Sequence, residues 1–311
     1  MLANVPAWFV RTFALLFGLL FGSFLNVVIH RVPRGESIVT PGSHCACGKP
    51  IAPFDNVPVL SWLLLRGRAR CCGAPISPRY PLIELLGGLL VLAIFELDVV
   101  RQPPDAPLLP LVATATGNAG LALSLLAAAF IDLEHMYLPD GITIGGAVFA
   151  LLWTSVRADG GWAEAAVGAM VGFWGIYLPF IVLYRVIRGR QGMGLGDAKL
   201  QALVGAWMGW RAVVFTLFAG AIQGTIAALV LLSRKGKIEE PEAVRREREE
   251  ALAAGEPLDP EEDPVALPPG EGLGAARIAF GPFLILAALE WLLFRGWLLG
   301  HLPILGADVL P

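Results

Sequence analysis

Apolar residues run along most of this chain in blocks too long for the elements of an ordinary soluble domain. Residues 13–30, FALLFGLLFGSFLNVVIH, form one such block, and about 20 apolar residues are enough to cross the hydrocarbon core of a bilayer. The pattern predicts an all-α, polytopic membrane protein with about eight transmembrane helices. Their expected ranges are 8–30, 82–100, 108–131, 140–156, 163–186, 195–210, 212–233 and 277–299.

Two polar segments interrupt the apolar pattern. Residues 31–80 are rich in Arg, Pro, Gly and Cys, whereas residues 234–276 are charged, acidic and proline-rich, with at most one charged helix expected. We therefore expect five parts. They are a first helix (1–30), a Cys-containing cytoplasmic domain (31–80), a six-helix membrane core (81–233), a charged mobile loop (234–276) and a last helix with a tail (277–311).

Composition agrees with a membrane protein and says little more. The chain is 56% hydrophobic and 16% charged, with a formal net charge of −3. This balance gives no sign of a nucleic-acid partner, and we expect none. The first apolar block lacks a small-residue cleavage site, and arginines follow it instead of preceding it, so we interpret it as a retained anchor helix and not as a signal peptide.

Basic residues predict the orientation. They are concentrated in the connections after the first, fifth and seventh expected helices and are sparse in the alternate connections. Because basic loops stay in the cytoplasm, both chain ends are expected outside. The basic residues that decide this are Arg31, Arg34, Lys49, Arg66, Arg68, Arg70, Arg79, Arg185, Arg188, Arg190, Lys199, Arg234, Lys235 and Lys237.

This orientation places two acidic residues on the cytoplasmic side. Asp132 follows an apolar run directly, in FIDLEHMYLPDGIT, and Asp197 begins the sixth expected helix, in GMGLGDAKL. Carboxylates at a membrane boundary are costly and should face protein or water. Two that approach to about 3 Å cannot both ionise, so the pair holds one proton and can deprotonate a water while protonating a carbonyl. Gly194 and Gly196 would allow close approach of a substrate backbone and a positive φ.

Structural explanations compete with this chemistry. An aspartate at a helix start is a common N-cap, Asp132 can cap a turn, and Lys199 can simply pair with Asp197. The two aspartates on one membrane face, one of them in a Gly-x-Gly-Asp sequence, favour the chemical interpretation.

Several stretches in one order and spacing resemble the type IV prepilin peptidases, of the GxGD class of intramembrane aspartic proteases. They are GSFLNVVIHRVP, NVPVLSWLLLRGRARCCGAPISPRYPLIELLGG, IDLEHMYLPD and GMGLGDAKL, between about residues 13 and 233. The resemblance implies a bifunctional enzyme of the bacterial inner membrane. It would cut the basic leader of type IV prepilins or type II secretion pseudopilins after a glycine at the cytoplasmic face. It would then methylate the new N-terminus, typically phenylalanine, with S-adenosylmethionine.

The same resemblance implies the site residues. Asp132 and Asp197 match the catalytic pair, and Asp140 takes a structural or supporting part. The membrane-embedded helix and the cytoplasmic leader of a prepilin place the cleaved bond at the boundary where loop charge also places both aspartates. Pilin substrates and membrane lipid are the expected partners.

Four cysteines in the first polar segment predict a structural zinc site. Relatives carry two C-x-x-C pairs, but here Cys45 and Cys47 form C-x-C, and Cys71 and Cys72 are adjacent. Four thiols from two short turns still suit tetrahedral zinc, with His44 as a spare ligand, although adjacent cysteines chelate one ion awkwardly. Buried thiols without metal are the alternative, and a disulfide is disfavoured in a reducing cytoplasm.

The methyl-donor site is not evident, because no glycine-rich strand–turn–helix occurs. Asn26, Arg31, Glu84 and Lys199 are polar candidates, and Glu84 can also attract a basic leader or pair with Arg79. The acidic stretch 239–271 is expected to be a solvated tether or, alternatively, a docking segment for a pilus assembly partner.

Other classes of protein share intramembrane carboxylates. A transporter or ion-handling protein would show inverted repeats and acidic groups near mid-membrane, and neither is found. A presenilin-like or preflagellin-cleaving protease would not account for the cysteine-bearing segment.

Overall fold

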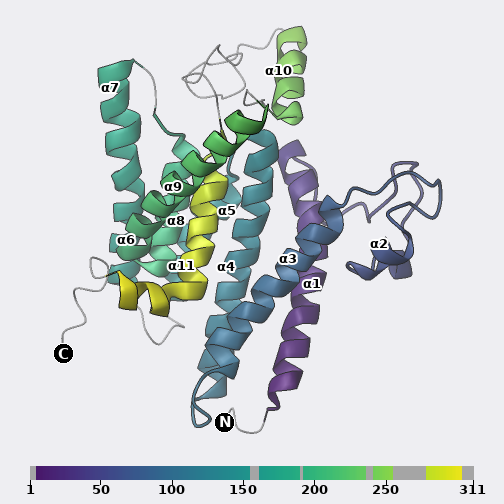
Figure 1. Ribbon diagram of the computed structural model, residues 1–311, viewed down its shortest axis with the longest axis horizontal. Helices are drawn as coiled ribbons and strands as arrows, with labels where there is room; N and C mark the ends of the chain where they lie inside the picture. Colours follow the sequence, from purple (N-terminus) through teal and green to yellow (C-terminus); the bar gives the residue numbers. More distant parts are fainter. Residues whose placement is uncertain (1–4, 155–160, 190–191, 236–240, 255–277, 303–311) are drawn as a thin grey trace. The chain divides into compact units, whose positions relative to one another are not determined.

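The computed structural model describes residues 5–154, 161–189, 192–235, 241–254 and 278–302 (Figure 1). Within these ranges regular structure is almost entirely helical, apart from two isolated β-bridges between His44 and Pro50 and between Arg68 and Pro75. The predicted all-α class is therefore confirmed.

Five helical stretches of the described chain are long and apolar enough to cross a bilayer. The first is α1 (Ala7–Arg31), extended by the short η2 (Val32–Arg34), and the third continues from α6 through the π-helical η5 into α7. That third stretch consists of α6 (Trp162–Ile176), η5 (Tyr177–Leu183) and α7 (Tyr184–Arg188). The other three stretches are α4 (Leu108–His135), α9 (Trp210–Lys235) and α11 (Gly281–His301).

The other three expected spans are helical but shorter. The first is α3 (Arg79–Phe95), which continues into the π-helix η4 (Glu96–Val100). The other two are α5 (Asp140–Trp153) and α8 (Leu195–Met208). At 1.5 Å per residue, a helix the length of α5 or α8 covers only about 21 Å, less than the hydrocarbon thickness of about 30 Å. Most of α8 is buried by α5, α6, α9 and α11. Helix α8 is therefore enclosed by other helices. Because it is not surrounded by lipid, it does not need an apolar run as long as the bilayer is thick.

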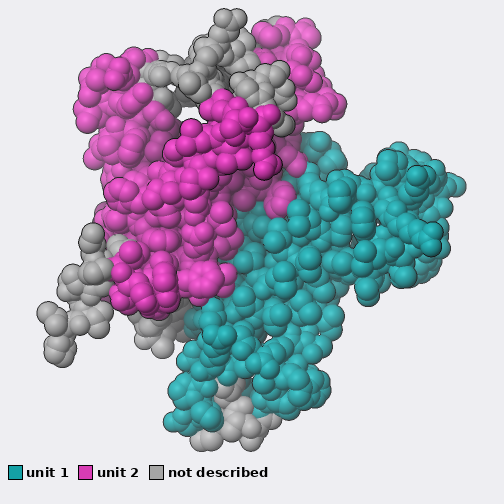
Figure 2. Space-filling view, viewed as in Figure 1, with its two compact units in different colours: residues 1–127 teal, residues 128–311 magenta. Residues whose placement is uncertain are grey.

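The chain forms two compact units, residues 1–127 and 128–311, which Figure 2 colours separately. In the first unit α1 and α3 lie side by side (Figure 1). Glycines allow this close contact: a Cβ added at Gly18 would lie 2.6 Å from the Gly87 carbonyl oxygen, and one at Gly22 2.8 Å from Glu84 Cα. The connection between these helices holds η3 (Pro53–Asp55) and α2 (Leu60–Leu64).

In the second unit α8 is the central helix. It packs against α6 through Gly168, Gly172 and Gly205, where an added Cβ would collide with the backbone of the opposite helix. On the other side of the unit, α9 contacts α11, and Gln223 Nε2 donates a hydrogen bond to Glu290 Oε2 (2.8 Å). This packing fixes the ends of α8 and α11, where the acidic residues of interest gather.

Candidate active site

Asp132 lies in the last turn of α4 and is only 5% exposed. The helix ends three residues later at His135, and Met136 has a left-handed φ of 54°, which ends the helical conformation. Pro139 then begins α5 as its N-cap residue, with the fixed φ that suits a helix start. The short turn between α4 and α5 therefore holds Asp132 at a helix end instead of in an extended loop.

Asp197 lies in the first turn of α8 and is 9% exposed. Its Oδ2 accepts a hydrogen bond from the backbone N–H of Gly194, the N-cap residue, at 3.3 Å. The carboxylate therefore takes the part of the acidic residue in a capping box. This capping contact is real, but it occupies one donor and does not by itself explain why the carboxylate is buried.

The expected positive φ in the GxGD sequence is wrong. Gly194 has φ −72° and ψ 150°, and Gly196 is already helical. Helix α8 already begins at Leu195, so Gly196 is helical and Gly194 is extended. Both are conformations that any residue can adopt. What glycine provides at 196 is room, because an added Cβ would lie 3.4 Å from Leu138 Cβ.

The structure brings Asp132 and Asp197 together within the second unit. Both are buried, and the Asp197 carboxyl interacts electrostatically with Asp132. Leu138, from the turn after α4, lies against the start of α8 at Gly196 and against the start of α11 at Gly281. Two acidic groups thus share one buried region where the end of α4 meets the beginnings of α8 and α11.

Gly281 is a residue of this region that the sequence did not single out. It is buried at the first position of α11, and its backbone lies against the Asp132 carboxyl group, where an added Cβ would be 2.5 Å from Oδ2. A Gly-Pro pair at the start of an apolar helix, as in AFGPF, was the available signal. It carries no titratable group, so a search for chemical side chains passes over it.

Lys199 does not pair with Asp197, contrary to the structural alternative considered above. Its Nζ lies 2.7 Å from Oδ1 of Asp140, the first residue of α5. The pair joins the first turns of α5 and α8, the two helices that follow the acidic sequences. This contact agrees with a supporting part for Asp140.

The charged segment after α9 contains one helix within the described residues. Residues 242–254 form helix α10 (Glu242–Ala254), whereas 236–240 and 255–277, which include most of the stretch 239–271, lie outside the described residues. Val244 is fully buried, and Glu247 Oε1 lies 2.8 Å from Nδ1 of the buried His135. Helix α10 therefore contacts α4 one turn beyond Asp132.

The four thiols in the first unit form one cluster. Their Sγ atoms all lie within 4.8 Å of one another, with 3.5 Å between Cys45 and Cys72 and 3.4 Å between Cys47 and Cys71. Zn–S bonds of about 2.3 Å in a tetrahedron require S···S separations of about 3.8 Å, so the donor set fits zinc. The adjacent cysteines therefore do not prevent a four-thiol arrangement. His44 is outside the cluster, and its Nδ1 lies 3.2 Å from the Gly42 carbonyl oxygen.

Two similar turns produce the thiol cluster. In the first, the Cys45 N–H donates to the Lys49 carbonyl, and Gly48 takes φ 82°; in the second, the Ala69 N–H donates to the Ala74 carbonyl, and Gly73 takes φ 71°. The backbone N–H of Cys47, followed by the thiols of Cys71 and Cys72, lowers the pKa of Cys45 to about 7. Thiolates are the metal-binding form of cysteine.

The polar candidates for a methyl-donor site have partners within the chain. Asn26 Nδ2 donates to the Tyr80 carbonyl, and Arg31 donates to the carbonyls of Ser37 and Pro41. Glu84 Oε2 accepts the backbone N–H of Val59 at 2.7 Å, so it holds the loop before α2. With Lys199 bound to Asp140, these residues do not define a donor site, and no step of methyl transfer is assigned to them.

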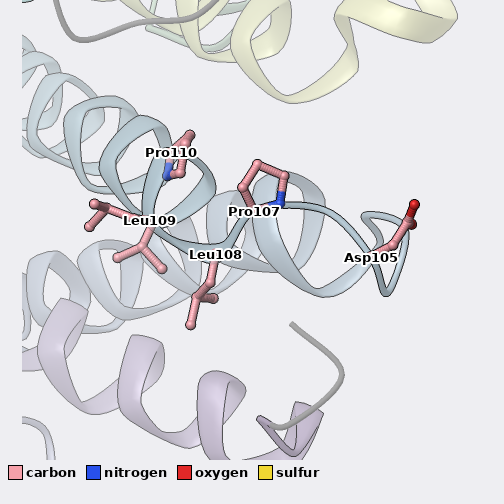
Figure 3. A pocket seen from close by; sticks show the side chains of 6 residues that line it. Asp105, Pro107, Leu108, Leu109 and Pro110 are labelled. Carbon is pink, nitrogen blue, oxygen red and sulfur yellow. The ribbon is translucent and has the colours of Figure 1, made fainter. Parts of the chain in front are cut away.

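A shallow apolar depression lies at the opposite end of α4 from Asp132 (Figure 3). It is lined by Asp105, Pro107, Leu108, Leu109, Pro110 and Val112. No second acidic residue and no thiol lines it, so it has no part in the site described above.

Comparison with known proteins gives matches over both units. Residues 16–97 match the bacterial peptidase A24 N-terminal domain, and residues 119–229 match the type IV leader peptidase family. A prepilin leader peptidase/N-methyltransferase of Myxococcus xanthus is 34% identical, with 97% of this chain and 96% of that protein covered. Proteins of the same name from Klebsiella pneumoniae and Aeromonas hydrophila are 44% and 37% identical, covering 66% and 74% of this chain and 88% and 84% of their own lengths. No solved structure matches.

Proposed function

The chain belongs to the type IV leader peptidase family, and we propose that it cleaves prepilin leaders with Asp132 and Asp197 as its catalytic pair. It is a multi-pass membrane peptidase with N-methyltransferase activity, and prepilins are its substrates. A transporter function is not favoured. The observation that supports the assignment is the burial of both carboxyl groups in one region, where Leu138 lies against both Gly196, next to Asp197, and Gly281, next to Asp132.

Two neighbouring carboxyl groups that share one proton can cleave a peptide bond. The ionised member removes a proton from a water molecule, and the oxygen of that water attacks the scissile carbonyl carbon. The protonated member donates to the carbonyl oxygen, which gives a tetrahedral diol. Collapse of the diol breaks the C–N bond as a proton passes to the leaving nitrogen, which becomes the new N-terminus. The carboxyl pair ends with one proton, as it began.

The position of the pair suits a substrate that lies partly in the membrane. Asp132 ends one helix that can span the bilayer, and Gly281 begins another, so the site lies at a membrane boundary. We propose that this boundary is the cytoplasmic face of the bacterial inner membrane, an orientation that the basic connections support. We propose that the pilin helix stays in the bilayer while its basic leader, in the cytoplasm, is cut off after a glycine.

The remaining components have separate tasks. S-adenosylmethionine is the proposed methyl donor, and it supplies an electrophilic methyl group to the new N-terminal amine. Zinc is the metal that we propose for Cys45, Cys47, Cys71 and Cys72. These thiols would hold the ion and thereby fix the two turns on each other, a structural task that contributes no step to either reaction.

Incubation of the purified protein with a prepilin and labelled S-adenosylmethionine tests the proposal, with cleavage and methyl transfer scored together. Asp132→Asn and Asp197→Asn are each expected to lower cleavage by a factor of about 10⁴ or more, while the protein still inserts into the membrane. Asp105→Asn, at the exposed opposite end of α4, is the matched control and should cleave normally. Cleavage retained in either of the first two variants would show that the pair is assigned wrongly.

A further inference from the structure

The start of α11 contributes a hydrogen-bond donor to the acidic region. Gly281 is the first residue of this helix, so its backbone N–H has no partner within the helix. That N–H carries part of the positive end of the helix dipole, which favours a negative group. It lies instead beside the carboxyl group of Asp132, which is 95% buried and therefore shielded from competing water.

A side chain at position 281 would displace the carboxyl group. A Cβ added there would lie 2.5 Å from Asp132 Oδ2 and 3.2 Å from its Cγ. The same atom would lie 3.3 Å from Leu138 Cδ1, a much milder contact. Only glycine therefore brings a backbone amide this near to Asp132.

Packing against α9 fixes the start of α11. A Cβ added at Gly224 of α9 would lie 3.3 Å from Phe283 and 3.4 Å from Phe280, the residues on either side of the Gly281–Pro282 pair. Gly220 makes a similar contact with Leu284. Pro282 limits its own φ and adds no competing N–H. The donor at Gly281 is therefore held by rigid elements.

The second carboxyl group has an equivalent donor. The N–H of Gly194, at the start of α8, binds Asp197 Oδ2. Each acidic residue thus lies beside the backbone N–H of a glycine at a helix start: Gly194 caps the helix of Asp197 itself, and Gly281 begins α11, next to Asp132. Gly194 holds Oδ2 of Asp197, which leaves Oδ1 for a water molecule or a peptide carbonyl.

From this geometry we infer that Gly281 is a positioning residue of the peptidase, whose N–H fixes the Asp132 carboxyl group for reaction. The inference rests on the proposed catalytic role of Asp132. It makes the last membrane helix part of the peptidase site, although no acidic residue lies at its start. Displacement of a reacting group by about 1 Å costs roughly 10²-fold in rate, which sets the size of the expected effect.

Kinetics of Gly281→Ala test the inference. The variant should cleave a prepilin with kcat lowered about 10²-fold and KM unchanged, because the added methyl group displaces the reacting carboxyl group of Asp132. Methyl transfer to a pilin that is already cleaved should be unchanged, which also shows that the variant is folded. Gly296→Ala is the matched control on the same helix, where an added Cβ meets nothing within 4 Å. Cleavage by Gly281→Ala at the wild-type kcat would overturn the inference.

A second substitution separates positioning from helix packing. Leu138→Ala removes the milder contact of the new methyl group but leaves the contact with Asp132. The double variant Gly281→Ala/Leu138→Ala should therefore stay impaired, and restored cleavage would overturn the inference. Asp132→Asn serves as the reference: if it is inactive while Gly281→Ala is normal, only the inference fails, whereas an active Asp132→Asn removes the proposed function itself.

A measurement on the unaltered backbone avoids dependence on the folding of Gly281→Ala. Labelling with ¹³C′-Phe and ¹⁵N-Gly selects the amides of Gly18, Gly22 and Gly281, since these glycines follow a phenylalanine. The Gly281 amide proton should resonate downfield and move upfield in Asp132→Asn, while the Gly18 and Gly22 signals stay in place. A Gly281 signal that does not respond to Asp132→Asn would contradict the hydrogen bond and with it the inference.

Discussion

Lys199, two residues after Asp197, forms its ion pair with Asp140, and 2.7 Å separate Nζ from Oδ1. The lysine is about three-quarters buried and the aspartate is mostly exposed. This pair links the first turns of α5 and α8 on the outside of the acidic region. Because Lys199 is bound to Asp140, it does not act as the counter-ion of the buried pair.

Removal of this ion pair should affect stability only slightly. We expect Asp140→Asn and Lys199→Gln each to lower the free energy of unfolding by less than about 1 kcal/mol, as for other pairs open to solvent, and to retain leader cleavage. Thermal unfolding in detergent and a prepilin cleavage assay provide the measurements. A loss of cleavage as complete as that in Asp132→Asn would show instead that the pair acts directly in the reaction.

The thiol cluster should bind metal through all four sulfurs. Cys72→Ser is expected to lower both the zinc content and the midpoint of thermal unfolding, because one of four converging ligands is lost. His44→Ala provides the control and should retain zinc, since its ring lies outside the cluster. Metal analysis of the purified proteins, before and after a chelator, decides the matter. Equal metal content in Cys72→Ser and the parent protein would exclude this site.

Helix α10 should loosen when its contact with His135 is removed. Glu247→Gln takes the charge from a half-exposed partner of a buried histidine, and we expect a cost of about 1 kcal/mol. Amide hydrogen exchange in residues 242–254 should become about five-fold faster. The matched change Glu242→Gln removes an ion pair with Arg246 within the same helix and should alter this exchange much less. Equal exchange in both variants would mean that Val244 alone holds the helix.

The contact between α6 and α8 should depend on glycine. Gly205→Ala places a methyl group against the Gly168 carbonyl, and overpacking of this kind costs about 1–3 kcal/mol. Gly175→Ala, on α6 but facing open space, should leave the unfolding temperature unchanged or raise it slightly. Thermal unfolding of the two variants gives the comparison. Equal stability would show that the two helices separate without cost.

The sequence by itself determined the helical membrane class and the location of both aspartates at helix ends. Long apolar runs leave a bilayer-spanning chain few alternatives to helices, because every backbone polar group must be satisfied within the segment. The ranges of α1, α4, α9 and α11 follow from these runs to within a few residues. The GxGD sequence and its counterpart around Asp132 also stand out, since carboxylates are rare beside apolar runs of this length.

Tertiary structure decided what surrounds those aspartates. No pattern along the chain shows that Lys199 binds Asp140, that Glu247 reaches His135 across more than a hundred residues, or that Gly281 lies against Asp132. Such contacts depend on which helices become neighbours, and that choice depends on close packing at glycines such as Gly168 and Gly205. Local sequence fixes where a helix begins and ends, whereas packing among all the helices fixes which ends meet.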